Sequence, residues 1–128
     1  MTERQARQLI TSYVEAYNRF DVAGMLACLH DDIVFQDVSV GEVTLTTRGK
    51  AEFEVQAEQA THYFTQREQR IVDWELLGGD ELAIHIDYTG VLAVDLPDGL
   101  PAGGTLRLQG RSVFRFTADK IISLTDYS

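Results

Sequence analysis

An acidic side chain interrupts the apolar face of a predicted strand over residues 31–40, DDIVFQDVSV. Because side chains alternate between the two faces of a strand, Asp37 falls on the same face as Ile33 and Phe35. A carboxylate on an apolar face needs a hydrogen-bond partner, a raised pKa or an opening to water. Asp37 is therefore a candidate functional residue. The alternative is a structural role, in which it ends strand pairing, binds a backbone N–H or reaches water at the rim of the sheet.

Two more polar side chains face inward by the same alternation. In TLRLQGRSVFRF, residues 105–116, Ser112 lies on the apolar face and Arg111 lies on the opposite one. In the last predicted strand Asp126 shares a face with Leu124. If Leu124 faces the interior of the fold, Asp126 faces it too and is a second candidate acid.

Metal, cofactor and nucleophile motifs are not found in the sequence. His85 and Asp87 share a strand face, but no HxxxH, HExxH or paired-cysteine spacing accompanies them. The glycines do not form a strand-GxGxxG-helix phosphate site, and no serine sits in a GxSxG elbow. The lone Cys28 lies among apolar residues, as a small core residue does. We therefore expect neither a metal nor a cofactor.

Three helices are predicted in the first half of the chain, and they would position these side chains from one side. Thr2 and Gln5 form a capping box, and apolar residues recur at three- and four-residue steps as far as Phe20. Asp21 caps a short second helix. The segment from about Lys50, KAEFEVQAEQATHYF, has one apolar helical face and predicts a third helix.

The second half of the chain has the two-residue period of strands. Strands are predicted at 69–77 and 81–96, followed by the Pro- and Gly-rich loop of a long hairpin at 96–104 and a tight turn at 118–120. Helices followed by strands predict an α+β fold, with a mainly antiparallel curved sheet that the helices cover on one face. On the strand at 82–88, the sequence does not show which face lines the interior.

The composition narrows the possible partners. A length of 128 residues with 45% hydrophobic and 24% charged residues predicts one domain over residues 1–128. The formal charge of −9 repels a phosphate backbone and an anionic membrane, so neither nucleic acid nor a membrane is an expected partner. The polar start MTERQARQ and the lack of a long apolar run predict neither a signal peptide nor a membrane helix, and we expect a cytoplasmic protein.

The order and spacing of these elements resemble the nuclear transport factor 2-like superfamily, and within it the ketosteroid isomerases and SnoaL-like polyketide cyclases. The resemblance rests on SYVEAYNRFDVAGMLACLHDDIVFQDV, on the long hairpin, on RSVFRF and on the terminal KIISLTDYS, and it covers nearly the whole chain. It implies a cone-shaped, strongly curved sheet, helices that enclose an apolar cavity with it, and a homodimer.

The resemblance also implies roles for individual residues. The tyrosine that stabilises the oxyanion in ketosteroid isomerases falls on Tyr13, and the general-base aspartate falls on Asp37. Ser112 stands where those isomerases have a second, protonated aspartate, which argues against steroid isomerisation itself. A late acid/base residue in some SnoaL-like cyclases favours Asp126. The alternatives are a core aromatic for Tyr13 and a small, space-making residue for Ser112.

The sequence thus predicts a cofactor-independent enzyme of isomerase, cyclase or dehydratase type, acting on a small hydrophobic cyclic or polyketide-like carbonyl compound. Asp37 would move the proton, Tyr13 would hold the developing oxyanion, and Asp126 or Ser112 would assist. The alternative is a non-catalytic domain of the same fold that binds a hydrophobic ligand or serves for dimerisation. The residues predicted to line the cavity are Tyr17, Phe20, Phe35, Phe53, Trp74, Phe114 and Leu124.

Overall fold

The computed structural model describes every residue of the chain except Asp98. Three helices and six strands follow one another in the order α1 (Glu3–Asn18), α2 (Val22–Ala27), β1 (Leu29–Ser39), β2 (Glu42–Arg48), α3 (Gly49–Thr61), β3 (Phe64–Gly78), β4 (Glu81–Leu92), β5 (Thr105–Thr117) and β6 (Lys120–Tyr127).

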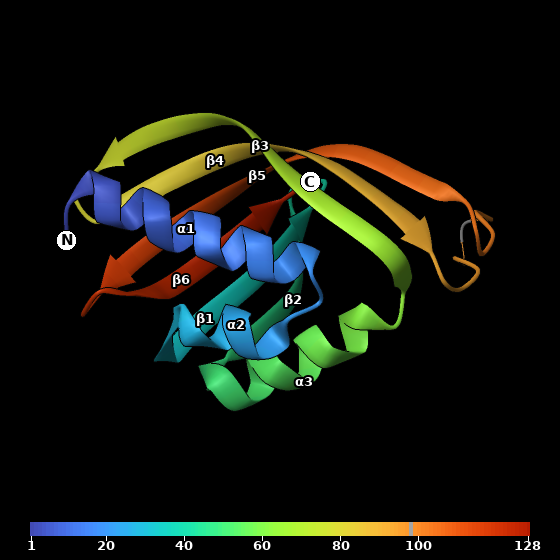
Figure 1. The fold of residues 1–128 in the computed structure, drawn as a ribbon, viewed down its shortest axis with the longest axis horizontal. Helices are drawn as coiled ribbons and strands as arrows, with labels where there is room; N and C mark the ends of the chain where they lie inside the picture. The colour runs from blue at the N-terminus through green and yellow to red at the C-terminus, as the bar shows by residue number, and fades with distance from the viewer. Residues whose placement is uncertain (98) are drawn as a thin grey trace.

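The six strands form one curved, unclosed sheet in the order β2-β1-β6-β5-β4-β3. β1 and β6 are parallel, and all other neighbours are antiparallel. The helices lie together on the concave side of the sheet, and α1 runs along its length (Figure 1). The predicted α+β fold with a mainly antiparallel curved sheet is confirmed.

The helix starts follow the predicted caps. The backbone N–H of Gln5 donates to Thr2 Oγ1 at 3.1 Å, and the backbone N–H of Thr2 donates to Gln5 Oε1 at 2.8 Å. At the start of α2 the backbone N–H of Gly24 donates to Asp21 Oδ1 at 2.9 Å. These bonds satisfy donors that a helix leaves free in its first turn, so they fix where α1 and α2 begin.

One strand was not predicted, and three element boundaries differ from the prediction. The sequence predicts no strand over β2, an edge strand that is mostly exposed and rich in threonine, because it lacks the apolar face that signals a strand. β3 begins at Phe64, before the predicted start at residue 69, and α3 ends at Thr61, before the predicted end at residue 64. β4 ends at Leu92, before the predicted end at residue 96. The segment TQREQ, 65–69, is polar, and its pairing with β4 rather than its hydrophobicity makes it a strand.

The core lies between α1 and the concave face of the sheet. Its fully buried members include Ile10 from α1, Ile33 from β1, Ile84 from β4 and Ile121 from β6. On β4 the structure settles which face is inside: Leu82, Ile84, Ile86 and Tyr88 are buried toward the helices. No helix in the described part of the chain is long and apolar enough to cross a membrane.

Candidate functional site

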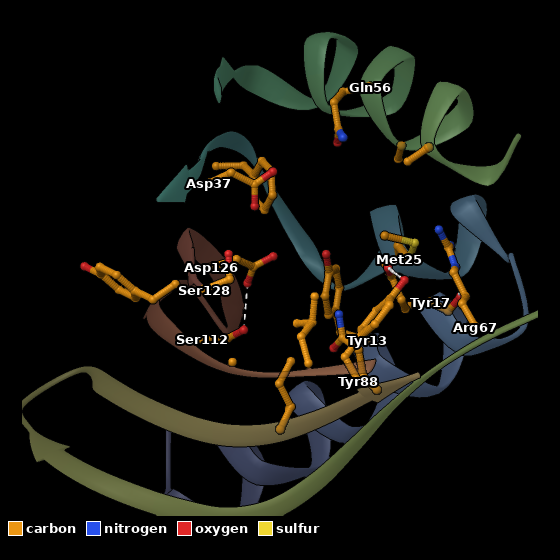
Figure 2. Close-up of a pocket in the computed structure, with 18 of the residues that line it drawn as sticks. Tyr13, Tyr17, Met25, Asp37, Gln56, Arg67, Tyr88, Ser112, Asp126 and Ser128 are labelled. Atoms are coloured by element: carbon orange, nitrogen blue, oxygen red, sulfur yellow. Dashed lines mark hydrogen bonds between the residues drawn. The ribbon is translucent and has the colours of Figure 1, made fainter. Parts of the chain in front are cut away.

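A cavity of about 290 Å³ lies between the helices and the concave face of the sheet. Its walls come from all three helices and from β1, β3, β4, β5 and β6. Figure 2 shows two groups of polar side chains inside it, which we call the acid end (Asp37, Asp126 and Ser112) and the arginine end (Arg67, Tyr17 and Tyr88). Tyr13 lies between them.

The acid end is a row of three side chains across three neighbouring strands. Asp37 on β1 is the register partner of Asp126 on β6, and Asp126 is in turn the register partner of Ser112 on β5. Register partners share a face of the sheet, and neighbouring strands lie roughly 4.8 Å apart, so the three side chains enter the cavity side by side. The Ser112 hydroxyl donates to Asp126 Oδ1 at 2.7 Å.

Both aspartates hold their protons more tightly than a free carboxyl does. Burial raises the pKa of Asp126 to about 7; the neighbouring Asp37 carboxylate adds to this rise, and the Ser112 hydrogen bond counteracts it. Burial also raises the pKa of Asp37 above its ordinary value. Asp126 therefore exists in both protonation states near neutral pH, which is the condition that suits an acid/base group.

Tyr13 provides a neutral hydroxyl near these carboxyls. It comes from the buried face of α1, is 4% exposed, and packs its ring edge-to-face on Phe114 at 6.1 Å between centroids. Burial, followed by the negative charge of Asp126, raises the pKa of Tyr13 well above its ordinary value. Among the described residues its hydroxyl has no hydrogen-bond partner, so it is free to donate to a bound molecule.

In the arginine end, Tyr17 was predicted to line the cavity, but Arg67 and its place beside Tyr17 and Tyr88 were not anticipated from the sequence. The Tyr17 and Tyr88 hydroxyls are 2.8 Å apart and hydrogen-bonded to each other. The Arg67 guanidinium lies 3.7 Å from the centroid of the Tyr17 ring and 4.5 Å from that of Phe20, and its Nε donates to the Tyr17 carbonyl oxygen at 2.9 Å. If the alternation of β3 is continued from Ile71 toward the N-terminus, Arg67 falls on the inner face. The sequence before residue 69 gave no strand signal, so this continuation was not predicted.

The structure brings some predicted residues to the cavity and leaves others outside it. The four predicted catalytic residues all line it, as do the predicted contacts Tyr17, Phe35 and Phe53. Four other predicted contacts lie elsewhere: Phe20 packs under Arg67, Trp74 packs against Arg7, and Phe114 and Leu124 are buried in the core. The alternation of side chains along the strands correctly predicted that Phe114 and Leu124 lie on the concave face. That face also contributes the core beneath α1, and both residues belong to this core.

The polar side chains of the cavity are suited to proton chemistry. Within residues 1–97 and 99–128, no group of three or more His, Cys, Asp or Glu side chains is placed to hold a metal ion. The polar groups of the cavity are carboxyls, hydroxyls, amides and one guanidinium. What this set can do is donate, accept and transfer protons.

Comparisons with known proteins agree with the fold. The SnoaL-like domain family matches residues 10–124. A candidate polyketide cyclase from Xanthomonas campestris is 25% identical, with a TM-score of 0.81 over 98% of this chain and 90% of its own. Another from Pseudomonas putida is 26% identical, with a TM-score of 0.72 over 94% and 88%.

A more distant neighbour shows the same architecture. A hypothetical protein with a ketosteroid isomerase-like fold from Catenulispora acidiphila is 17% identical, with a TM-score of 0.76 over 94% of this chain and 84% of its own. No curated protein has a sequence significantly similar to this one.

Proposed function

Because the chain belongs to the SnoaL-like domain family, we propose that it is a cofactor-independent acid/base enzyme that acts on a small hydrophobic cyclic or polyketide-like carbonyl compound. One observation carries the proposal: Asp37 and Asp126 are register partners on two parallel strands and enter one cavity together, beside the free hydroxyl of Tyr13. Two carboxyls of raised pKa next to a neutral donor are the groups that proton transfer next to a carbonyl requires.

In this mechanism the Asp37 carboxylate accepts a proton from the carbon next to the substrate carbonyl. The electron pair of the broken C–H bond forms the enolate, and the negative charge develops on the carbonyl oxygen. The Tyr13 hydroxyl and the protonated form of Asp126 donate hydrogen bonds to that oxygen. From a β,γ-unsaturated ketone the enolate is a dienolate, and it takes the proton back from Asp37 at the γ-carbon, which is isomerisation. Alternatively the enolate carbon attacks a second carbonyl, whose oxygen takes up the proton, which is an aldol cyclisation.

Ser112 acts on this chemistry through Asp126. Its hydrogen bond lowers the pKa of Asp126, against the effect of burial and of the Asp37 charge. Without such a donor, Asp126 would stay protonated further above neutral pH. Ser112 therefore serves as a positioning residue, and Asp126 provides the carboxyl group that the position of Ser112 lacks.

Deuterium uptake from heavy water tests the proposal. The substrates are cyclic ketones and polyketide-like diketones, and the proteins are the wild type, Asp37→Asn and, as a surface control, Asp32→Asn, which removes an exposed carboxylate from the same strand. We expect uptake next to the carbonyl with the wild type and the control, and a loss of at least about 100-fold with Asp37→Asn. If Asp37→Asn exchanges as fast as the wild type, Asp37 is not the base.

The same experiment separates catalysis from simple ligand binding. A protein that binds panel ketones saturably but exchanges none of them, in the wild type as in the variants, would be a hydrophobic-ligand-binding domain. Folding of each variant is checked by circular dichroism and thermal melting, so that lost exchange is not confused with lost structure.

A further inference from the structure

Arg67 is a buried cation with no anionic partner among the described residues. The residue is 5% exposed, and no Asp or Glu oxygen in the described part of the chain lies within 4.0 Å of its guanidinium. One terminal nitrogen, Nη2, is buried and has no hydrogen-bond acceptor among the described residues. Buried charges in proteins are normally paired, since an unpaired one loses its hydration without compensation.

A structural role accounts for only part of this arrangement. Nε binds the Tyr17 carbonyl in the last turn of α1, where a positive charge is favourable, and the guanidinium plane rests on the rings of Tyr17 and Phe20. These contacts join α1 to β3. They leave Nη2 without an acceptor among the described residues, although a guanidinium fork suits two carboxylate oxygens.

The surrounding groups add further donors. Tyr17 and Tyr88 have two hydroxyl protons, and the bond between them uses one, so the other is available to a ligand oxygen. Burial raises the pKa of both phenols, which keeps both protons in place at neutral pH. Gln69, which is 9% exposed, also lines the cavity and is the register partner of Tyr88.

Resting on the proposed function, we propose that the arginine end binds a carboxylate of the substrate, so that the substrate is a cyclic keto acid. Its carboxylate lies against Arg67 and the Tyr17–Tyr88 pair, and its ketone lies at the acid end beside Tyr13, as the placement of the two ends in Figure 2 allows. A volume of about 290 Å³ is at the small end of ligand sites and suits a compound of one or two rings.

Calorimetric binding tests this assignment without requiring turnover. The probes are a tetralone carboxylate, a bicyclic ketone with a carboxylate on its aromatic ring, and its neutral methyl ester. Charge-assisted hydrogen bonds to a buried guanidinium favour the acid by roughly 10- to 100-fold in the wild type. Arg67→Gln abolishes this preference, and Arg67→Lys, which keeps the charge, retains part of it.

Two further variants serve as comparisons. Arg70→Gln removes an arginine of the same strand whose side chain is 64% exposed, and it leaves the preference unchanged. Tyr88→Phe removes one hydroxyl and weakens acid binding by a few-fold more than ester binding. If Arg67→Gln does not fold, the wild type, Arg67→Lys and Tyr88→Phe still decide the question.

The proposal is overturned if the wild type binds the ester as tightly as the acid, or if folded Arg67→Gln keeps the preference. Deuterium uptake on the same two probes keeps the proposed function separate. If both probes exchange but the acid does not bind more tightly than the ester, the proposed enzymatic function stands and the proposed carboxylate site is refuted. If the acid binds more tightly than the ester but neither probe exchanges, the proposed carboxylate site stands and the proposed acid/base function is refuted.

Discussion

Replacing Asp126 by Asn should stabilise the folded protein at alkaline pH, although it removes a group of the candidate site. In the folded state the pKa of Asp126 is raised from 3.8 to about 7, mainly by burial. Between these two pH values the folded state holds a proton that the unfolded state has lost, so stability falls as pH rises from about 4 to about 7 and then levels off. At about 1.36 kcal/mol per pH unit, the carboxylate costs at most about 4 kcal/mol above pH 7.

The Asp126→Asn variant would avoid this loss, because the new amide is neutral and its oxygen can still accept the Ser112 hydrogen bond. Urea unfolding at fixed protein concentration, between pH 4 and pH 8, gives the free energy of unfolding of the wild type, Asp126→Asn and the surface control Asp32→Asn. We expect the advantage of Asp126→Asn over the wild type to grow by up to about 4 kcal/mol from pH 4 to pH 8. A difference that stays constant with pH, or that shrinks, would show that burial does not raise this pKa.

Two other predictions concern the neighbours of Asp126. Ser112→Ala removes the hydrogen bond that lowers the pKa of Asp126, so the Asp126 pKa should rise by about one unit, measured by carbon NMR of the labelled carboxyl group; an unchanged or lower pKa would contradict the assigned bond. Tyr13→Phe should slow ketone exchange by about 100- to 1,000-fold, as expected for loss of one oxyanion donor. Its thermal stability should stay close to that of the wild type, since the Tyr13 hydroxyl has no partner among the described residues, and unimpaired exchange would remove Tyr13 from the mechanism.

Most of the fold could be predicted because local signals agreed with it. The capping box at Thr2 and Gln5, the cap at Asp21 and the alternation in β5 each reflect short-range physics, and each appears where it was expected. β2 was missed because an exposed edge strand needs no apolar face. The parallel pairing of β1 with β6 was beyond reach for another reason, since it joins segments far apart in the chain and no local pattern encodes it.

For the candidate site too, local sequence patterns predicted some features and tertiary structure determined the others. Strand phase placed Asp37, Ser112 and Asp126 on inner faces, and all three line the cavity. Side-chain alternation could not predict the register between β1 and β6. This register makes Asp37 and Asp126 direct neighbours, and the charge of Asp37 raises the pKa of Asp126 for that reason. Arg67 was not predicted as a site residue, because an arginine in a polar segment such as TQREQ is usually exposed to solvent. Only the tertiary contact with α1 buries it.

The separation between the two ends of the cavity matters to both. A guanidinium next to Asp126 would favour the carboxylate and lower its pKa, and the site would then lose the protonated acid that donates to an oxyanion. Arg67 acts on the pKa values of Tyr13, Tyr17 and Tyr88 but is not among the causes of the Asp126 shift. The fold thus keeps a buried cation and a half-buried acid in one cavity without letting them neutralise each other. Both charges destabilise the empty protein, and a keto acid that places its carboxylate on Arg67 would recover part of that free energy on binding.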